Sequence, residues 1–179
     1  MSAQIGLIAN PAAGKDIRRL IAHGTSLDNQ AKIAMLRRIL VGVQAMGSIE
    51  ILAMPDASHL IQRALEGIGG NKLQVNYVDM AVTNLPADSA KAAQAMQQAQ
   101  CACILVLGGD GTARLVSLVD IPLLPISTGT NNVLPVTTEG TLAGMVAGAI
   151  ALRLIDAEQI CYQHKWLEIR DNNTYVDRA

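Results

Sequence analysis

An aspartate stands among three glycines at residues 108–112, which read GGDGT. The segment follows an apolar run, and the spacing of Leu115, Leu118 and Val119 behind it predicts a helix. A strand, a glycine loop and a helix in this order point backbone amides at one place, where the helix dipole favours an anion. Asp110 then suits a ligand that brings Mg²⁺, or a hydroxyl that must lose its proton. The alternative for Asp-Gly is a β-hairpin turn.

Two further polar loops follow predicted strands. Residues 10–15 read NPAAGK, and Asn10, Gly14 and Lys15 could line a second side of a phosphate pocket. An ordinary turn into a helix, with Lys15 in solvent, explains that stretch equally well. Residues 127–132 read STGTNN, a composition that also caps helices. Three such loops at equivalent strand ends predict one crevice. Neither a Walker loop nor a Rossmann fingerprint is present, so a nucleotide here is bound in another way.

Apolar stretches of strand length alternate with segments of helical period along the chain. Strands are expected at residues 4–9, 49–54, 73–79, 102–108 and 122–126. Helices are expected at residues 17–22, 29–46, 58–68, 87–100 and 140–154. This alternation predicts a three-layer α/β fold, with a mostly parallel sheet covered by helices on both faces. In the last helix, Gly144 and Gly148 are expected to pack closely on the sheet rather than to form a membrane dimer motif.

The pattern changes near His164, where a strand, a turn at Asp171-Asn172-Asn173 and a second strand are expected. A hairpin at the end of a parallel-sheet chain has no obvious partner. We therefore expect a nucleotide-binding α/β domain at residues 1–163 and the beginning of a C-terminal β-rich domain at residues 164–179. Most of that second domain would lie outside this sequence.

Composition excludes several classes of protein. The 179 residues carry 14 basic and 15 acidic side chains without a basic run, so neither nucleic acid nor an anionic membrane is expected as the main partner. The longest apolar region, Leu142–Leu152, is too short for a membrane span, and a cytoplasmic protein is expected. Three cysteines argue against a disulfide framework, and their spacing offers too few ligands for a metal site.

The three loops in this order resemble those of the superfamily that holds NAD kinases, diacylglycerol kinases and sphingosine-type lipid kinases. Within it, GLIANPAAGKDIRRL and LPISTGTNNVLP look most like the ATP-NAD kinase-like proteins of the acetoin catabolism protein X branch. The resemblance implies an N-terminal α/β domain, a C-terminal β-sandwich domain and an active site in the cleft between them. It also implies that Asp110 is the general base toward an acceptor hydroxyl or helps to hold Mg²⁺.

The remaining site residues follow from the same resemblance. Those implied to bind the phosphates of ATP are Gly108, Gly109, Gly111 and Thr112. Those implied to line the nucleotide site are Asn10, Thr128, Gly129, Thr130, Asn131 and Asn132.

The resemblance predicts an ATP- and Mg²⁺-dependent phosphotransferase that acts on an alcohol, with NAD as the first candidate acceptor and a homo-oligomeric state. Two alternatives stay open: a lipid kinase, and a nucleotide-binding regulatory protein without turnover. Lipid kinases have Asn-Asp where this chain has Asn131-Asn132, and NAD kinases carry a Phe-containing segment there, whereas this chain has no Phe. Polyphosphate is an alternative donor to ATP.

Overall fold

The computed structural model describes residues 3–13, 27–69, 73–165, 167–172 and 174–178, with the backbone alone at 168 and 174–178. The helix predicted at residues 17–22 lies outside these residues.

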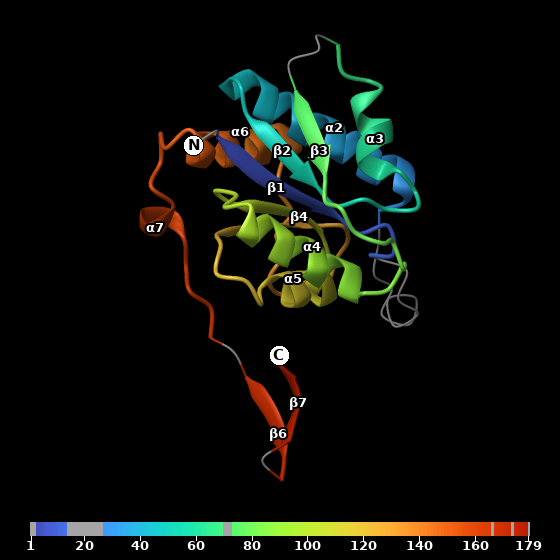
Figure 1. Ribbon diagram of the computed structural model, residues 1–179, viewed down its shortest axis with the longest axis vertical. Helices are drawn as coiled ribbons and strands as arrows, with labels where there is room; N and C mark the ends of the chain where they lie inside the picture. Colours follow the sequence, from blue (N-terminus) through green and yellow to red (C-terminus); the bar gives the residue numbers. More distant parts are fainter. Residues whose placement is uncertain (1–2, 14–26, 70–72, 166, 173, 179) are drawn as a thin grey trace.

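Five parallel strands form the central sheet. They are β1 (Gln4–Ala9), β2 (Glu50–Ala53), β3 (Gln74–Tyr77), β4 (Ile104–Gly108) and β5 (Leu123–Ser127). The strand order is β3-β2-β1-β4-β5, and every neighbouring pair is parallel (Figure 1). The chain therefore winds outward from β1 in one direction and from β4 in the other. Sheets of this kind bind ligands where the strand order reverses, beyond the carboxyl ends of the two central strands. Here that point lies at the ends of β1 and β4.

Helices cover both faces of the sheet, which confirms the predicted three-layer α/β fold (Figure 1). One face is packed by α2 (Asn29–Met46), α3 (Leu60–Leu65) and α6 (Gly140–Ala151), and the other by α4 (Ala87–Gln98) and α5 (Asp110–Val116). The helix predicted at residues 58–68 spans only Leu60–Leu65, and Asp56 accepts the amide of Leu60 at its beginning.

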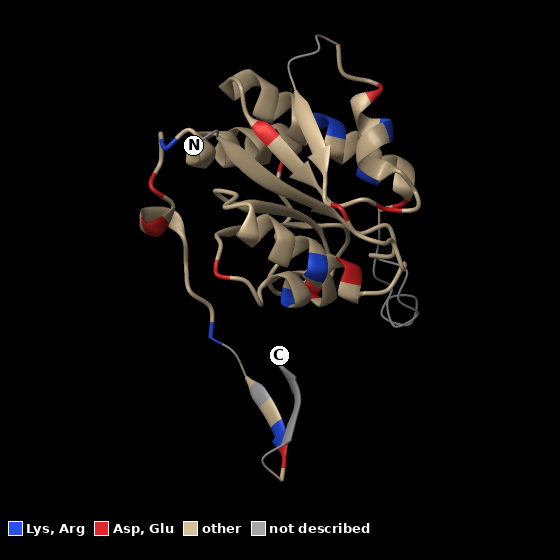
Figure 2. Ribbon diagram, in the orientation of Figure 1, with Lys and Arg blue, Asp and Glu red and all other residues tan. Residues whose placement is uncertain are grey.

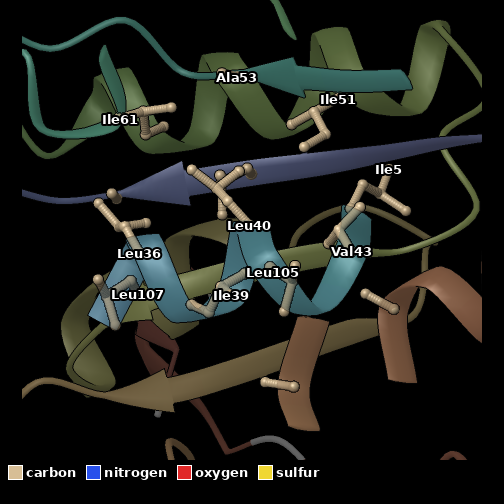
Figure 3. Packing of buried hydrophobic residues seen from close by; sticks show 14 of the residues in the cluster. Ile5, Leu36, Ile39, Leu40, Val43, Ile51, Ala53, Ile61, Leu105 and Leu107 are labelled. Atoms are coloured by element: carbon tan, nitrogen blue, oxygen red, sulfur yellow. The ribbon is translucent and has the colours of Figure 1, made fainter. Parts of the chain in front are cut away.

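The core between α2 and the sheet is made of branched aliphatic side chains. In Figure 3, Leu36, Leu40 and Val43 point from α2 toward the sheet, where Val43 lies beside Ile5 of β1, and Leu105 of β4 belongs to the same cluster. All five are fully buried. Their three- and four-residue spacing forms the apolar stripe that anchors the helix, and burial of such side chains contributes about 1.5–3 kcal/mol each.

Helix α6 packs on α2 with almost no space between the two backbones. A Cβ atom on Gly144 would lie 2.0 Å from the carbonyl oxygen of Ile39, and one on Gly42 would lie 2.1 Å from that of Thr141. Close packing at Gly144 was expected, but the expected partner is wrong: the glycine contacts helix α2 rather than the sheet. Other residues of α6 do reach the sheet, since the thiol of Cys103, just ahead of β4, lies 3.8 Å from the carbonyl oxygen of Ala147, but Gly144 lies on the side of α6 that faces α2.

The chain after α6 leaves the α/β part. A short helix, α7 (Ala157–Ile160), is followed by an antiparallel pair, β6 (Glu168–Asp171) and β7 (Thr174–Arg178), which is the predicted hairpin. The pair forms a separate two-stranded sheet that extends away from the central one (Figure 1). Exposed apolar side chains line this segment, among them Leu154, Tyr162 and Leu167.

Charge differs from helix to helix: α2 carries three basic and no acidic residues, α6 carries no charge, and α4 and α5 carry both signs. Figure 2 shows basic and acidic residues on several elements, without one large patch of a single sign in this view. In the part of the chain that the structure describes, no helix has the length and apolar character needed to cross a membrane.

Candidate functional site

The GGDGT segment connects a strand to a helix. Strand β4 ends at Gly108, Gly109 is extended, and α5 begins at Asp110. The amides of Thr112 and Ala113 both donate to the carbonyl oxygen of Gly109 at 3.0 Å, which closes the first helical turn. The β-hairpin alternative is therefore wrong, and the strand–loop–helix interpretation is confirmed.

The glycines of this loop differ in what surrounds them. A Cβ atom on Gly108 would lie 2.7 Å from the Cβ of Thr112, so the side chain of Thr112 occupies that space. A Cβ atom on Gly111 would have no atom of the described residues within 4 Å. Packing therefore requires glycine at 108, whereas at 111 the missing side chain leaves open space in front of the helix.

The first polar loop contacts the GGDGT segment directly. The side-chain amide of Asn10 donates to the hydroxyl of Thr112 at 2.9 Å, and the backbone amide of Asn10 donates to Leu107 at 3.1 Å. The side-chain oxygen of Asn10 accepts from the amide of Ala12. One asparagine thus ties the loop after β1 to the first turn of α5. Gly14 and Lys15, which were predicted in the same loop, lie outside the described residues.

The third loop is held by the carboxylate of Asp110. Both oxygens accept from the amide of Val133 at 2.9 Å, and Oδ1 also accepts from Leu134 at 2.9 Å. The backbone amide of Asp110 donates to the side-chain oxygen of Asn132 at 3.3 Å, and the backbone amide of Thr128 donates to the carbonyl oxygen of Gly108 at 3.2 Å. A carboxylate in the first turn of a helix is favoured by the helix dipole. Asp110 therefore joins two loops, a role that sequence reasoning missed.

Within the third loop, Asn132 needs both halves of its amide. Its nitrogen donates to the hydroxyl of Ser127 at 2.7 Å and to the carbonyl of Gly129 at 3.2 Å, while its oxygen accepts from Asp110. An ionised aspartate has no donor for the first two bonds. This is a physical reason for asparagine at a position where lipid kinases have aspartate.

The remaining predicted residues of the loop differ in exposure. Thr130 and Asn131 are exposed, and Asn131 adopts the left-handed conformation (φ 62°), which asparagine tolerates well. Thr128 is fully buried, and its hydroxyl has no hydrogen-bond partner among the described residues. Thr130 and Asn131 thus face solvent at the mouth of the loop, whereas Thr128 lies beneath it.

Two adjoining hollows extend from Asn10 across the ends of β2 and β3. The smaller, of about 90 Å³, lies between Asn10 and Asp88, and the larger, of about 390 Å³, is lined by Asp56, Tyr77 and Asn84 among others. Sequence reasoning missed this groove, because its residues follow strands without a glycine motif.

The two carboxylates of the groove are perturbed in opposite directions. Burial raises the pKa of Asp56, and the amides of Leu60 and Ser58 offset this only in part. Burial also acts to raise the pKa of Asp88, but hydrogen bonds from Thr83 and Asn84 outweigh it and leave that pKa below its usual value. Both side chains therefore hold backbone turns, one at the beginning of α3 and one ahead of α4.

Metal ligands are sparse around these loops. Among the described residues, no three His, Cys, Asp or Glu side chains gather closely enough to hold an ion. Two of the cysteines, Cys101 and Cys103, are buried, and burial raises their pKa values to about 11 and about 12. These thiols stay protonated at neutral pH and pack as small apolar groups.

A parallel sheet with three polar loops gathered at its switch point defines a nucleotide-binding α/β protein of the kinase-like type. The chain belongs to the ATP-NAD kinase family: the family's sequence model for the ATP-NAD kinase N-terminal domain matches residues 5–152. It is also 38% identical, over 181 aligned positions, to Acetoin catabolism protein X of Cupriavidus necator. That alignment covers 94% of this chain and 50% of the relative, so the chain spans about half the relative's length. The predicted superfamily and branch are confirmed.

Proposed function

We propose that the protein transfers a phosphoryl group from ATP to an alcohol, with NAD as the first candidate acceptor. The observation that carries the proposal is the convergence of three loops at the switch point, joined by the Asn10–Thr112 and Asp110–Val133 hydrogen bonds. Phosphoryl transfer depends mainly on positioning and charge stabilisation, and a crevice built by cross-linked loops supports the positioning.

The phosphates are proposed to lie against the first turn of α5. Gly111 leaves that surface open, and main chain without side chains allows close approach of phosphate oxygens. Gly108, Gly109 and Thr112 shape the turn from below. Thr130 and Asn131 are proposed to contact the nucleotide from the third loop, and Gly14 and Lys15 from the first.

Asp110 is proposed to accept the proton of the attacking hydroxyl. Its Oδ2 accepts from Val133 only, among the described residues, so one of its lone pairs stays available. The same oxygen suits one coordination position of Mg²⁺ carried by the triphosphate, which would neutralise developing phosphate charge when bound.

The nucleoside is proposed to extend from Asn10 into the groove toward Asp56 and Tyr77. The groove begins at the loop that touches Thr112, so a ligand can be continuous from one to the other. The second half of the cleft is proposed to come from a longer protein, since the chain spans about half of its relative. The exposed apolar side chains after α6 and the β6–β7 hairpin would begin that domain near residue 164. A cytoplasmic location and a homo-oligomeric state remain predictions.

One observation favours a second candidate, a nucleotide-binding regulatory protein without turnover. Asp110 already has a structural purpose, because it holds Val133 and Leu134, and that purpose needs no chemistry.

Two substitutions in the full-length protein separate these candidates. Asp110→Asn keeps an oxygen that accepts from Val133 and Leu134 but cannot take a proton, whereas Asp110→Ala loses both functions. With ATP, Mg²⁺ and NAD, we expect Asp110→Asn to lower kcat by about 10²–10⁴-fold with ATP affinity nearly unchanged. We expect Asp110→Ala to lower ATP affinity as well. Unchanged turnover by Asp110→Asn would remove the general-base role, and ATP binding without turnover on NAD or any other alcohol would favour the regulatory protein.

A further inference from the structure

A lysine is buried in the core of the α/β part. Lys32 lies in the first turns of α2, and only 1% of its surface is exposed. It belongs to the same helix face as Ile33 and Leu36, which pack in the core. Burying an ammonium group is costly unless its donors are satisfied. The position of Lys32 therefore calls for a specific set of acceptors.

Three acceptors among the described residues belong to one loop. The ammonium nitrogen of Lys32 lies 3.2 Å from the carbonyl oxygen of Asn10, 2.9 Å from that of Pro11 and 2.8 Å from that of Ala13. An ammonium group has three donors, and three carbonyl oxygens of this loop lie within hydrogen-bond distance of it. Hydrogen bonds from a charged donor are stronger than those between neutral groups. The lysine therefore holds the loop after β1 at three points.

The hydrogen bonds from Lys32 also affect the side of residues 10–13 that faces the GGDGT segment. The three carbonyls turn toward α2, while the amides of Ala12 and Ala13 bond back to Asn10 at 2.9 Å and 3.2 Å. The side chain of Asn10 is left to reach Thr112 in the GGDGT segment. A continuous chain of contacts thus runs from the Lys32 ammonium through Asn10 to the first turn of α5.

We propose that Lys32 is a positioning residue for nucleotide binding: it fixes residues 10–13 so that Asn10 stays docked on Thr112 and the wall of the crevice is preformed. An apolar side chain of similar length would fill the same volume without the desolvation cost, so packing alone gives no reason for a lysine. Preorganised loops bind more tightly because the ordering cost is met before the ligand arrives. The ligand is a nucleotide if the proposed function holds, but the inference does not depend on phosphoryl transfer.

Arg37 provides a matched control. It lies on the same helix and also donates to backbone carbonyls, those of Ala64 and Arg63, both at 3.3 Å. Its acceptors are at the end of α3, outside the three loops. Lys32→Met and Arg37→Met therefore each remove one cation from α2 together with its hydrogen bonds to backbone carbonyls, but only the first acts on the proposed site.

The experiment measures ATP binding with Mg²⁺ by calorimetry, together with urea unfolding, on the full-length protein and both variants. We expect Lys32→Met to weaken ATP binding about tenfold or more. We expect Arg37→Met to change ATP affinity less than about twofold, even if it lowers the urea unfolding midpoint as much as Lys32→Met does. In the transferase assay, Lys32→Met should raise KM for ATP far more than it lowers kcat. Lys32→Arg, which keeps the charge and the donors, should recover part of the affinity.

Hydrogen exchange at the amides of Ala12 and Ala13 supplies a readout that needs no ligand. We expect faster exchange there in Lys32→Met and wild-type exchange in Arg37→Met. Unchanged ATP affinity in Lys32→Met, or an equal loss in both variants, overturns the inference. If the wild-type protein binds no ATP, the proposed function fails, and unchanged exchange at Ala12 and Ala13 then overturns the role of Lys32 as well. If Lys32→Met does not fold, Lys32→Gln, which keeps two donors, takes its place in the same comparison.

Discussion

Glycines in two regions of the molecule have opposite surroundings. Along the contact between α2 and α6, the Cβ positions of Gly42 and Gly144 fall on carbonyl oxygens of the facing helix, at 2.1 Å and 2.0 Å. In the GGDGT loop, the Cβ position of Gly111 is empty of described atoms to 4 Å. The first pair permits two helices to touch. The second position is open although nothing in the described chain uses the space.

The difference teaches how to separate structural glycines from glycines that serve a ligand. Replacing a glycine that packing requires should lower the free energy of unfolding and leave ligand affinity unchanged. Replacing a glycine that keeps a surface open should lower ligand affinity and leave the free energy of unfolding nearly unchanged. Gly108 lies between these extremes, because its neighbour is the side chain of Thr112 rather than a backbone. Stability and ATP affinity, measured on the same variants, test this division.

Gly144→Ala should have the largest effect on stability. The added methyl group would meet the backbone of Ile39, which cannot move aside without shifting α2 from the sheet. We expect a loss of about 3 kcal/mol in the free energy of unfolding, at the upper end of the overpacking range. Urea denaturation measures it. A loss below about 1 kcal/mol would mean that the contact between α2 and α6 is looser than the geometry indicates.

Gly108→Ala should have an intermediate effect. The methyl group would meet the Cβ of Thr112, which rotation of that side chain cannot move, so the first turn of α5 must shift and disturb the bond between Thr112 and Asn10. We expect a loss of about 1–2 kcal/mol in unfolding free energy together with weaker ATP binding. The double variant Gly108→Ala, Thr112→Gly removes the Cβ atom that the methyl group meets. Its loss of unfolding free energy should therefore be smaller than the sum of the two single losses by about 0.5 kcal/mol or more. Simple additivity would show that Thr112 is not the obstacle.

Gly111→Ala should separate the two measurements. Alanine is a better helix former than glycine, and no clash is present in the described chain, so stability should stay level or rise by about 0.4–1 kcal/mol. ATP affinity should fall about tenfold, because the methyl group enters the space proposed for phosphate oxygens. If the unfolding midpoint of the variant is not lowered, a loss of affinity in the ATP titration cannot result from a loss of stability. Full affinity would place the phosphates elsewhere.

The sheet and the larger helices could be predicted because each carries its own local signal. The apolar runs of β1 and β4 and the periodic stripe of α2 are read without knowledge of their neighbours. The tertiary contacts of a small residue could not be predicted in this way. Gly144 packs on α2 instead of the sheet, and the local sequence pattern does not indicate which neighbouring element a helix face contacts.

The residues of the candidate site were predicted from the sequence, but the hydrogen bonds that join its loops were not. The GGDGT, NPAAGK and STGTNN stretches are visible as polar loops after strands, and the fold brings their described parts together. Bonds such as Asp110 to Val133 join residues 23 positions apart and depend on the tertiary fold. Lys32 was missed for a related reason, since a lysine beside apolar neighbours on a helix usually reaches solvent.

Gly69→Ala should have the smallest effect, and it sharpens the comparison with Gly111. A Cβ atom at Gly69 would also have no described atom within 4 Å, but the residue follows α3 and is exposed, away from the three loops. Openness alone should therefore have no consequence there: we expect changes within about 0.5 kcal/mol in stability and no change in ATP affinity. If Gly69→Ala weakened ATP binding as much as Gly111→Ala does, open space around a glycine would not distinguish the proposed site. If only Gly111→Ala weakens binding, the empty position in front of α5 is specifically the one a nucleotide fills.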